Sequence, residues 1–453
     1  MIGSFTLAEL ATLLAGELRG NDVEFDSVST DTRSLAQSDL FVALKGPNFD
    51  GDDYVLAAHD KGACAALVSR FSDCPIPQLR VADTEKALGL IGLQNRDRSD
   101  ACFVAVTGSQ GKTTIKEMTG HILSGVASTL MTQGNLNNAI GVPLTLLRLA
   151  ADHRFAVMEL GANHIGEIAW TTRLVKPSIA VISNATPTHL EGFGSLEGVV
   201  QGKGELLEGL SDDGVAVLNR DDPAWPRWRE RAGRHKVVSF SLTAADAQYR
   251  AAGIRLQPGQ NTEFQLVTPG GSASISLPLP GQHNVSNAIA AAAATLEAGV
   301  ALSDVVAGLA RTRAVKGRMC VLRGFADSRL IDDTYNASPN SFAAAIKVLC
   351  DFPGQKLLVA GDMGELGADS AALHARVGET AKAAGVDHLL TVGRDSAAAS
   401  AAFGSAARHF ASQAELVSVC KTMMNKQTTV LVKGSRSANM DKIVDLLIFN
   451  EAN

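Results

Sequence analysis

Along the chain, apolar residues fall into short continuous runs that alternate with stretches of helical character. In the middle of the sequence these runs end in small or polar residues, and they span 102–108, 155–161, 179–184 and 214–219. Continuous apolar runs are typical of parallel strands that are buried on both faces. We therefore predict a parallel sheet that is covered by helices on both sides.

The beginning of the chain has a different pattern. Residues 6–16 carry an apolar stripe, and Thr6 and Glu9 have the spacing of a capping box, which predicts a helix. Strand-like runs follow at 40–44 and 65–68, and a polar stretch near Arg98 ends this part. We expect a small α/β domain here.

The last third repeats the alternation of strand and helix. Its apolar runs are 329–335, 356–362, 388–393 and 428–435. Before them, the helical signal disappears between 221 and 280, which predicts a small antiparallel insert, and an Ala-rich stretch at 286–301 predicts a helix. The sequence thus predicts three α/β domains. They are an N-terminal domain of residues 1–98, a central domain of residues 99–312 that contains a parallel sheet, and a doubly wound, Rossmann-like domain of residues 313–453.

Composition narrows the class of protein. Hydrophobic residues make up 46% and aromatic residues 5% of the 453, the net charge is −6, and we find no Lys/Arg cluster. We therefore expect small-molecule substrates and no nucleic acid. The six cysteines form no C-x-x-C pair, the start of the chain does not resemble a signal peptide, and no apolar run approaches a membrane span. We expect a cytoplasmic protein without a membrane span.

The clearest motif is TGSQGKTT, residues 107–114, which follows an apolar strand and precedes a helix-compatible stretch. In such a turn, backbone N–H groups and the helix dipole bind phosphate. Lys112 would reach the β- and γ-phosphates, and the hydroxyl of Thr113 would hold Mg²⁺. The loop is one residue shorter than a Walker A motif, because Val106 stands where the first Gly is needed. The alternative is a Gly-rich turn with a surface lysine.

Other polar residues follow the predicted strands of the central domain, and so fall on the edge where α/β sheets bind ligands. They are Asn137, Asn138, Glu159, His189 and Lys203. Each has an ordinary alternative: the asparagines as turn formers, Glu159 as a helix cap, His189 as a structural histidine and Lys203 as a solvated lysine. Their common edge favours a phosphoryl-transfer site.

Ten motifs, taken in order, resemble those of the Mur ligases of bacterial cell-wall synthesis. They are TGSQGKTT, NLNNAIGVPLT, MELGANHIGEI, NATPTHLEGFGS, KGELL, GQHNVSNAIAA, KGR, IDDTYNASPNS, GDMGELG and VLVKGSR. The resemblance covers essentially the whole chain. NATPTHLEGFGS and IDDTYNASP are most similar to the branch of the family that adds D-alanyl-D-alanine. In the first domain, VSTDTRSL and LFVALKGPNFDGDDY look like a UDP-binding site.

The resemblance implies roles for individual residues. The ATP phosphates would contact Gly108, Ser109, Gly111, Lys112, Thr113 and Thr114. Two Mg²⁺ ions would be held by Thr113, Glu159, His189 and a carbamylated Lys203. The rest of the nucleotide would contact Asn284, Asn287, Arg318, Asp333 and Asn336, the last three from the third domain across a hinge near 312–316. The UDP-linked substrate would contact Ser29, Asp31, Arg33, Asn48, Asn137 and Asn138.

The activity implied is ATP-dependent formation of an amide bond. The carboxylate of UDP-N-acetylmuramoyl-tripeptide (UDP-MurNAc-tripeptide) would become an acyl phosphate, which the amine of D-Ala-D-Ala attacks. We expect a monomer. Asp52 stands where the family often has His, and Gly202 where Ala is usual. The alternatives are another Mur-type or folylpolyglutamate-type ligase and, from another class, a P-loop nucleotide switch.

Overall fold

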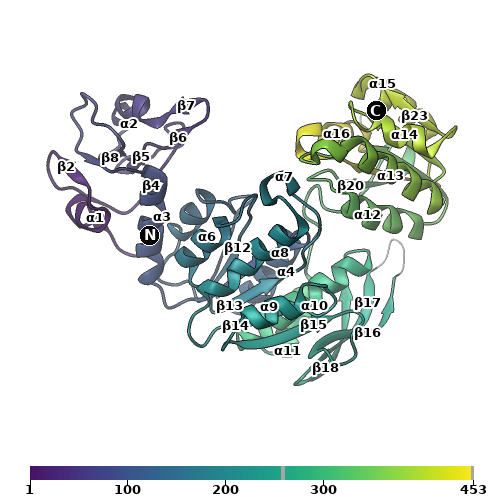
Figure 1. The fold of residues 1–453 in the computed structure, drawn as a ribbon, viewed down its shortest axis with the longest axis horizontal. Helices are drawn as coiled ribbons and strands as arrows, with labels where there is room; N and C mark the ends of the chain where they lie inside the picture. Colours follow the sequence, from purple (N-terminus) through teal and green to yellow (C-terminus); the bar gives the residue numbers. More distant parts are fainter. Residues whose placement is uncertain (257–260, 450–453) are drawn as a thin grey trace.

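A computed structural model describes residues 1–256 and 261–449. Figure 1 shows three parts in a bent row, with the N-terminal part at the left, the central part in the middle and the C-terminal part at the upper right. Each part contains a sheet with helices against it. The predicted three-domain α/β architecture is confirmed, while the domain limits at 98/99 and 312/313 stay predictions.

The N-terminal part begins with α1 (Leu7–Leu14), and both hydrogen bonds of its predicted capping box, between Thr6 and Glu9, are present. Its main sheet has the order β2 (Glu17–Arg19), β9 (Gln78–Arg80), β8 (Ala65–Val68), β5 (Leu40–Val42) and β4 (Val28–Ser29). The helices α2 (Val55–Asp60) and α3 (Thr84–Asp97) complete it. Because α3 also packs against helices of the central part, the first two parts share an apolar interface.

Within residues 1–256 and 261–449, the central sheet has nine strands. Their order is β11 (Thr129–Met131), β12 (Phe155–Glu159), β10 (Cys102–Thr107), β13 (Ile179–Ile182), β14 (Val215–Asn219), β15 (Lys236–Ser241), β16 (Tyr249–Arg255), β17 (Thr262–Thr268) and β18 (Gly271–Leu277). The pairings are parallel from β11 to β16 and antiparallel from β16 to β18. The predicted antiparallel segment therefore extends the edge of the parallel sheet.

Two apolar layers cover this sheet. One face carries α4 (Lys112–Ser124), α10 (Gln282–Glu297) and α11 (Leu302–Ala310). The other carries α5 (Gly141–Leu146), α6 (Glu167–Val175), α8 (Leu196–Gly204) and α9 (Trp225–Arg231). The Ala-rich helix α10 is buried along most of its length, because small side chains let it approach its neighbours closely. The short α7 (Leu190–Phe193) precedes α8.

Helix α9 corrects one prediction, because the sequence gave no helical signal between 221 and 280. The helix has seven residues and carries Pro226 in its first turn. A proline is tolerated there, since the first N–H groups of a helix have no partner in the helix itself. Trp225 and Trp228 are both buried against the sheet. So short a helix presents too few turns for its period to be recognised.

In the part of the chain that the structure describes, the C-terminal sheet has six strands. Their order is β19 (Cys320–Arg323), β20 (Arg329–Asp333), β24 (Thr428–Lys433), β21 (Gln355–Ala360), β22 (His388–Val392) and β23 (Ala407–Phe410). One face packs on α12 (Pro339–Asp351), α13 (Ser370–Ala383) and α14 (Ala397–Phe403). The other packs on α15 (Gln413–Met423) and α16 (Asp441–Leu447). All strands but β19 run parallel, as expected for a doubly wound domain.

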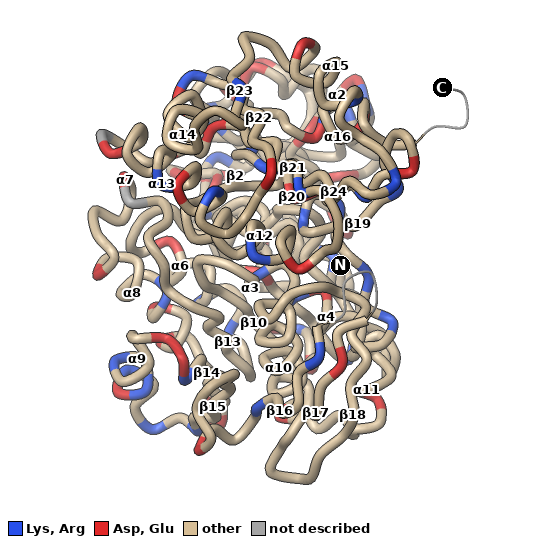
Figure 2. The backbone as a smooth tube through the Cα atoms, turned by 90° about the vertical axis from the view of Figure 1, so that its right-hand side faces the viewer, with Lys and Arg blue, Asp and Glu red and all other residues tan. Residues whose placement is uncertain are grey.

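Charge is distributed evenly. Figure 2 shows Lys and Arg interspersed with Asp and Glu through all three parts. Among the helices in 1–256 and 261–449, none is long and apolar enough to cross a membrane.

Candidate active site

A cleft of about 1810 Å³ lies between the central and C-terminal parts. The predicted site residues that line it are Ser109, Gly111, Lys112, Thr113, Thr114, Asn137, Asn138, Glu159, His189, Asn284, Asn287, Arg318, Asp333 and Asn336. Of the other predicted residues, Gly108 lies in the same loop and Lys203 is buried on α8. The sheet edge that the sequence predicted is thus one wall of a cleft between two parts of the chain.

The loop of residues 107–114 joins β10 to α4 and needs both of its glycines. Gly108 and Gly111 have φ values of +145° and +81°, and a side chain at either would meet Ser183 or Asn287 at less than contact distance. Lys112 is the first residue of α4, and its Nζ donates to the carbonyl of Gly108 at 2.7 Å. Burial lowers the pKa of Lys112. The loop thus places an ammonium group and a helix N-terminus at one point of the cleft, which suits the phosphates of ATP.

Glu159 lies at the end of β12, and both of its carboxylate oxygens accept hydrogen bonds. Thr113 Oγ1 donates to one carboxylate oxygen at 2.8 Å, and Asn137 Nδ2 donates to the other, also at 2.8 Å. The backbone N–H of Glu159 donates to Thr132 Oγ1 at 3.0 Å. The carboxylate therefore does not cap a helix. Together with the Thr113 hydroxyl it forms a pair of oxygen ligands of the kind that Mg²⁺ takes.

The two asparagines of NLNNAIGVPLT have different roles. Asn137 orients Glu159, as described above. Asn138 accepts hydrogen bonds from the backbone N–H groups of Ile140 and Gly141, at the start of α5. Asn138 is therefore a turn former, although it also lines the cleft.

His189 links the two walls of the cleft. It lies after β13 with φ at +52°, and its Nδ1 contacts the carboxylate of Glu365, which follows β21 in the C-terminal part. Burial lowers the pKa of His189, as does the positive charge of Lys112, whereas Glu365 raises it. A second contact between the walls runs from Gln110 Nε2 to Ser338 Oγ at 3.3 Å.

Lys203 is only 1% exposed, so it is not a solvated lysine. Its Nζ lies 5.0 Å from the centre of the Phe193 ring and 3.5 Å from the carbonyl of Ala162. Burial, and next the charge of Lys112, lower its pKa to about 7. The neighbouring Gly202 makes room for Phe193, because a Cβ there would stand 2.5 Å from the ring.

The predicted ligands of a second Mg²⁺ do not form one cluster. Within 1–256 and 261–449, no group of three or more His, Cys, Asp or Glu side chains could hold a metal ion. His189 is turned to Glu365, and Glu159 to Thr113 and Asn137. Lys203 as an amine supplies no anionic ligand, so this site depends on its chemical modification.

The predicted nucleotide contacts come from both walls. On α10, Asn287 lies against Gly111 of the phosphate loop and donates to Asn284 at 3.3 Å. From the C-terminal part, the guanidinium of Arg318 stacks 4.0 Å from the centre of the Tyr335 ring. Its Nε is buried and has no partner among the described protein groups, which leaves a donor free for a ligand.

Sequence reasoning assigned no chemical role to Lys433 or to Glu365, which it placed in a loop that shapes the site. Lys433 Nζ donates to Asp333 at 2.6 Å and to the carbonyl of Asn336 at 2.9 Å, so the carboxylate of Asp333 is engaged inside its own domain. Both missed residues lie within quoted motifs, VLVKGSR and GDMGELG. Lys433 ends β24 and Glu365 follows the neighbouring strand β21, and this position was the available signal.

The predicted UDP contacts lie in the N-terminal part, outside the main cleft. Ser29, Asp31 and Arg33 form one turn, in which the Arg33 guanidinium bonds to Asp31 at 2.7 Å and lowers the pKa of Asp31 to about 2. Asn48 lies apart, between β6 (Lys45–Gly46) and β7 (Phe49–Asp50). Asp52 is buried and accepts from the backbone N–H groups of Ser69 and Arg70, so it stabilises the fold.

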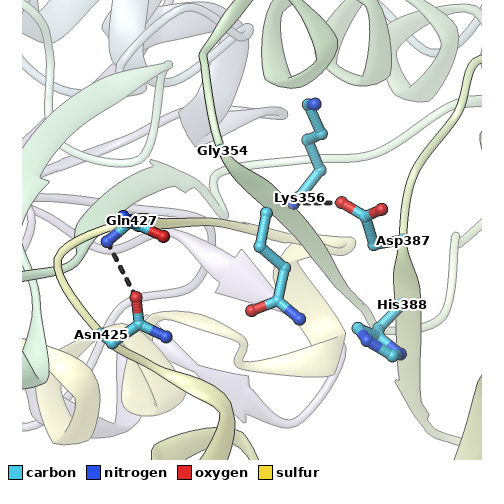
Figure 3. Close-up of a pocket in the computed structure, with 7 residues that line it drawn as sticks. Gly354, Lys356, Asp387, His388, Asn425 and Gln427 are labelled. Atoms are coloured by element: carbon cyan, nitrogen blue, oxygen red, sulfur yellow. Dashed lines mark hydrogen bonds between the residues drawn. The ribbon is translucent and has the colours of Figure 1, made fainter.

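A smaller pocket of about 440 Å³ lies at the opposite edge of the C-terminal sheet (Figure 3). Its wall includes Lys356, whose backbone N–H donates to Asp387 at 2.8 Å, and His388. None of the predicted site residues lines it. The large cleft is therefore the candidate active site.

Comparison with known proteins gives two family matches. Residues 106–295 match the Mur ligase middle domain, and residues 317–436 match the Mur ligase, glutamate ligase domain. The chain is 49% identical over 446 residues to the UDP-N-acetylmuramoyl-tripeptide–D-alanyl-D-alanine ligase of Escherichia coli (strain K12), covering 98% of each chain.

Solved structures agree over the full length. MurF from Acinetobacter baumannii superposes with a TM-score of 0.93 at 39% identity, covering 98% of this chain and 99% of that one. The MurF ligase from Thermotoga maritima, solved in complex with ADP, gives 0.84 at 26% identity, covering 93% and 96%. The chain therefore belongs to the Mur ligase family and, within it, to the UDP-N-acetylmuramoyl-tripeptide–D-alanyl-D-alanine ligases.

Proposed function

We propose that this enzyme uses ATP to join D-Ala-D-Ala to the C-terminal carboxylate of UDP-MurNAc-tripeptide, in the synthesis of peptidoglycan precursors. One observation carries the proposal. The phosphate loop and the Thr113–Glu159 pair lie in a cleft between two domains of a chain that matches such ligases from end to end. A cleft of this kind can hold a nucleotide and an acyl donor against each other.

The first step activates the tripeptide. A carboxylate is a poor electrophile, so one of its oxygens attacks the γ-phosphorus of ATP, the bond to the ADP oxygen breaks, and an acyl phosphate forms. The ammonium of Lys112 and the N–H groups at the start of α4 stabilise the charge that spreads over the phosphoryl oxygens. Thr113 and Glu159 would hold a Mg²⁺ ion, which neutralises charge on the same phosphates.

The second step forms the amide bond. The amine of D-Ala-D-Ala attacks the acyl carbon, a proton leaves the nitrogen, and inorganic phosphate departs with the bridging oxygen. Water in the cleft would hydrolyse the acyl phosphate instead. The contacts from His189 to Glu365 and from Gln110 to Ser338 hold the two walls together, and closure of this kind excludes water.

We also propose that Lys203 reacts with CO₂. A pKa of about 7 leaves roughly half of the amine neutral at pH 7, and the neutral amine is the form that adds to CO₂. The product is a carbamate, with loss of one proton. This anion would turn a buried cation into an oxygen ligand, and with His189 and Glu159 it would hold a second Mg²⁺.

We also propose that the remaining predicted residues bind the two nucleotide substrates. Asn284, Asn287, Arg318, Asp333 and Asn336 would hold the nucleotide, and the free Nε of Arg318 is the best support. Ser29, Asp31, Arg33 and Asn48 would hold the UDP end. We also propose that the enzyme is a monomer. The nucleotide substrates and the six unpaired cysteines suit the cytoplasm.

A phosphate-release assay tests the function. With ATP and Mg²⁺ present, release should require both UDP-MurNAc-tripeptide and D-Ala-D-Ala, and mass spectrometry should find the UDP-linked pentapeptide in equal amount. Phosphate release that is the same without these substrates would instead indicate a nucleotide switch. Parallel assays with diaminopimelate-containing and lysine-containing tripeptides would identify the natural donor.

A further inference from the structure

A closed ring of hydrogen bonds joins the start of α4 to the end of β12. Thr113, on α4, donates to the carboxylate of Glu159 at 2.8 Å, and the backbone N–H of Glu159 donates to Thr132 Oγ1 at 3.0 Å. The carbonyl of Thr132 accepts from the Nζ of Lys116 at 3.1 Å. Lys116 lies on α4 one turn after Thr113, so the ring returns to the helix on which it began. The ring therefore fixes the carboxylate relative to the hydroxyl.

The loop that follows β11 holds the end of β12 at three successive points. The N–H of Thr132 donates to the carbonyl of Val157 at 3.0 Å, just before Glu159. Farther along the loop, the carbonyl of Asn137 accepts from the N–H of Gly161 at 2.8 Å, and the side chain of Asn137 donates to Glu159. The loop is thus bonded to residues before, at and after Glu159, so its position decides where the carboxylate lies.

Lys116 is a buried cation that neither step of the proposed reaction uses. It is 1% exposed, as is Thr132, and its Nζ contacts the carboxylate of Glu117, which lines the cleft. A buried ion pair is weak evidence for stability, because the cost of desolvating two charges offsets their attraction. The ammonium does provide a directed donor to the carbonyl of Thr132, which an apolar side chain cannot provide. Since both residues are buried, they act on the cleft through Glu159.

We propose that Thr132 and Lys116 are positioning residues for the Mg²⁺ ion that accompanies ATP. They hold the carboxylate of Glu159 at hydrogen-bond distance from the hydroxyl of Thr113, so that both oxygens can meet one metal ion. The inference rests on the proposed function, because it concerns the metal that this function needs. Loss of a group that orients a metal ligand typically costs about tenfold to a hundredfold in metal affinity or activity.

Removal of a single hydroxyl tests Thr132. Thr132→Val keeps the shape of the side chain but leaves the N–H of Glu159 without its acceptor, whereas Thr132→Ser keeps the acceptor. The probe is Mn²⁺, which takes the same oxygen ligands as Mg²⁺, and electron paramagnetic resonance measures its binding to the complex of enzyme and ADP. Thr132→Val should bind Mn²⁺ about tenfold to a hundredfold more weakly, and Thr132→Ser should bind it like the wild type. KM for Mg²⁺ should rise with the loss of affinity, while KM for D-Ala-D-Ala stays unchanged.

Two further variants separate positioning from general stability. Thr295→Val is the matched control, because Thr295 is also buried but its hydroxyl donates to the carbonyl of Ala291 within α10. This variant should bind Mn²⁺ like the wild type. Lys116→Met should weaken Mn²⁺ binding by about threefold to tenfold, since Thr132 keeps its hydroxyl but loses its bond to α4. Circular dichroism checks each fold, and Lys116→Met decides the question if Thr132→Val does not fold.

Three results would overturn the inference. They are a folded Thr132→Val enzyme with the Mn²⁺ affinity of the wild type, a Thr132→Ser enzyme as weak as Thr132→Val, and an equal loss in Thr295→Val. A wild type that binds Mn²⁺ with ADP but makes no UDP-linked pentapeptide would instead overturn the proposed function. The two failures are thereby distinguished.

Discussion

Two regions beside the cleft each bury a lysine, and the two lysines differ in their hydrogen-bond partners. In the C-terminal sheet, Lys433 is 2% exposed and its Nζ bonds to the carboxylate of Asp333 and the carbonyl of Asn336. On α8 of the central part, Lys203 is 1% exposed, and its Nζ donates a long hydrogen bond of 3.5 Å to the carbonyl of Ala162. Lys112 adds repulsion there, and the pKa of Lys203 falls to about 7.

This difference in partners distinguishes a lysine that stabilises the fold from a lysine that can react. A buried lysine paired with a carboxylate forms an ion pair that joins two strands, here β20 and β24. A buried lysine without such a partner loses its proton easily, and a neutral amine is a nucleophile. Sequence alone cannot tell the two apart, because both sit in short glycine-containing motifs, QGKGE and LVKGS.

Removing Lys112 should have the largest effect. Lys112→Ala deletes the cation of the phosphate loop, and we expect turnover to fall by about a thousandfold or more. Loss of the same charge should raise the pKa of Lys203. Steady-state product formation measures the first effect. Near-normal activity in the variant would contradict the phosphate-loop assignment.

Lys203→Ala should come next, with a loss of roughly a hundredfold in kcat. Acetate or formate should restore part of the activity, because a small carboxylate can take the place of the carbamate. Product formation with and without these acids measures the rescue, and circular dichroism checks the fold. A folded variant that no acid rescues would remove the support for the carbamate.

For stability, the lysine of the C-terminal sheet should matter more than the lysine of α8, which is the reverse of their expected order for activity. Lys433→Met leaves Asp333 without its partner, and we expect the free energy of unfolding to fall by about 3 kcal/mol. Among the described residues Lys203 forms no ion pair, and burial of its charge is unfavourable, so we expect Lys203→Met to keep or raise the free energy of unfolding near pH 7. Urea unfolding measures both. Equal losses would mean that Lys203 is also a structural lysine.

The pH dependence of the free energy of unfolding tests the lowered pKa of Lys203. Because the pKa of Lys203 is lowered from 10.5 to about 7 in the fold, the unfolded chain binds more protons at this site between those values. The free energy of unfolding should therefore gain up to about 1.4 kcal/mol per pH unit from Lys203 as pH rises through that window. Urea unfolding in CO₂-free buffer should show a flatter pH profile for Lys203→Met. Identical profiles would refute the lowered pKa.

Much of the fold could be predicted because it follows from local patterns. The buried parallel strands read as continuous apolar runs, and the capping box at Thr6 fixed the start of α1. Helix α9 was missed because its apolar contacts are two tryptophans on a single turn. The edge strands β19 and β23 were missed too, since partly exposed strands carry no continuous apolar run.

From the sequence, a residue could be placed in the site only where it ends or follows a predicted strand. Glu159 and His189 meet that condition, and the structure places both in the cleft. The partners of these residues come from the tertiary fold. Glu365 reaches His189 from 176 residues away, and Lys433 reaches Asp333 from 100. Asp52 shows the reverse case, a polar residue near a predicted site whose bonds to Ser69 serve the fold.

An isotope experiment tests the central claim, that ATP activates the tripeptide carboxylate, most directly. UDP-MurNAc-tripeptide labelled with ¹⁸O in its terminal carboxylate is converted with ATP and D-Ala-D-Ala in ordinary water, and the released phosphate is analysed by mass. An acyl phosphate passes its bridging oxygen to phosphate, so we predict one ¹⁸O in each phosphate released. Unlabelled phosphate would show that water attacks ATP, which would contradict the account.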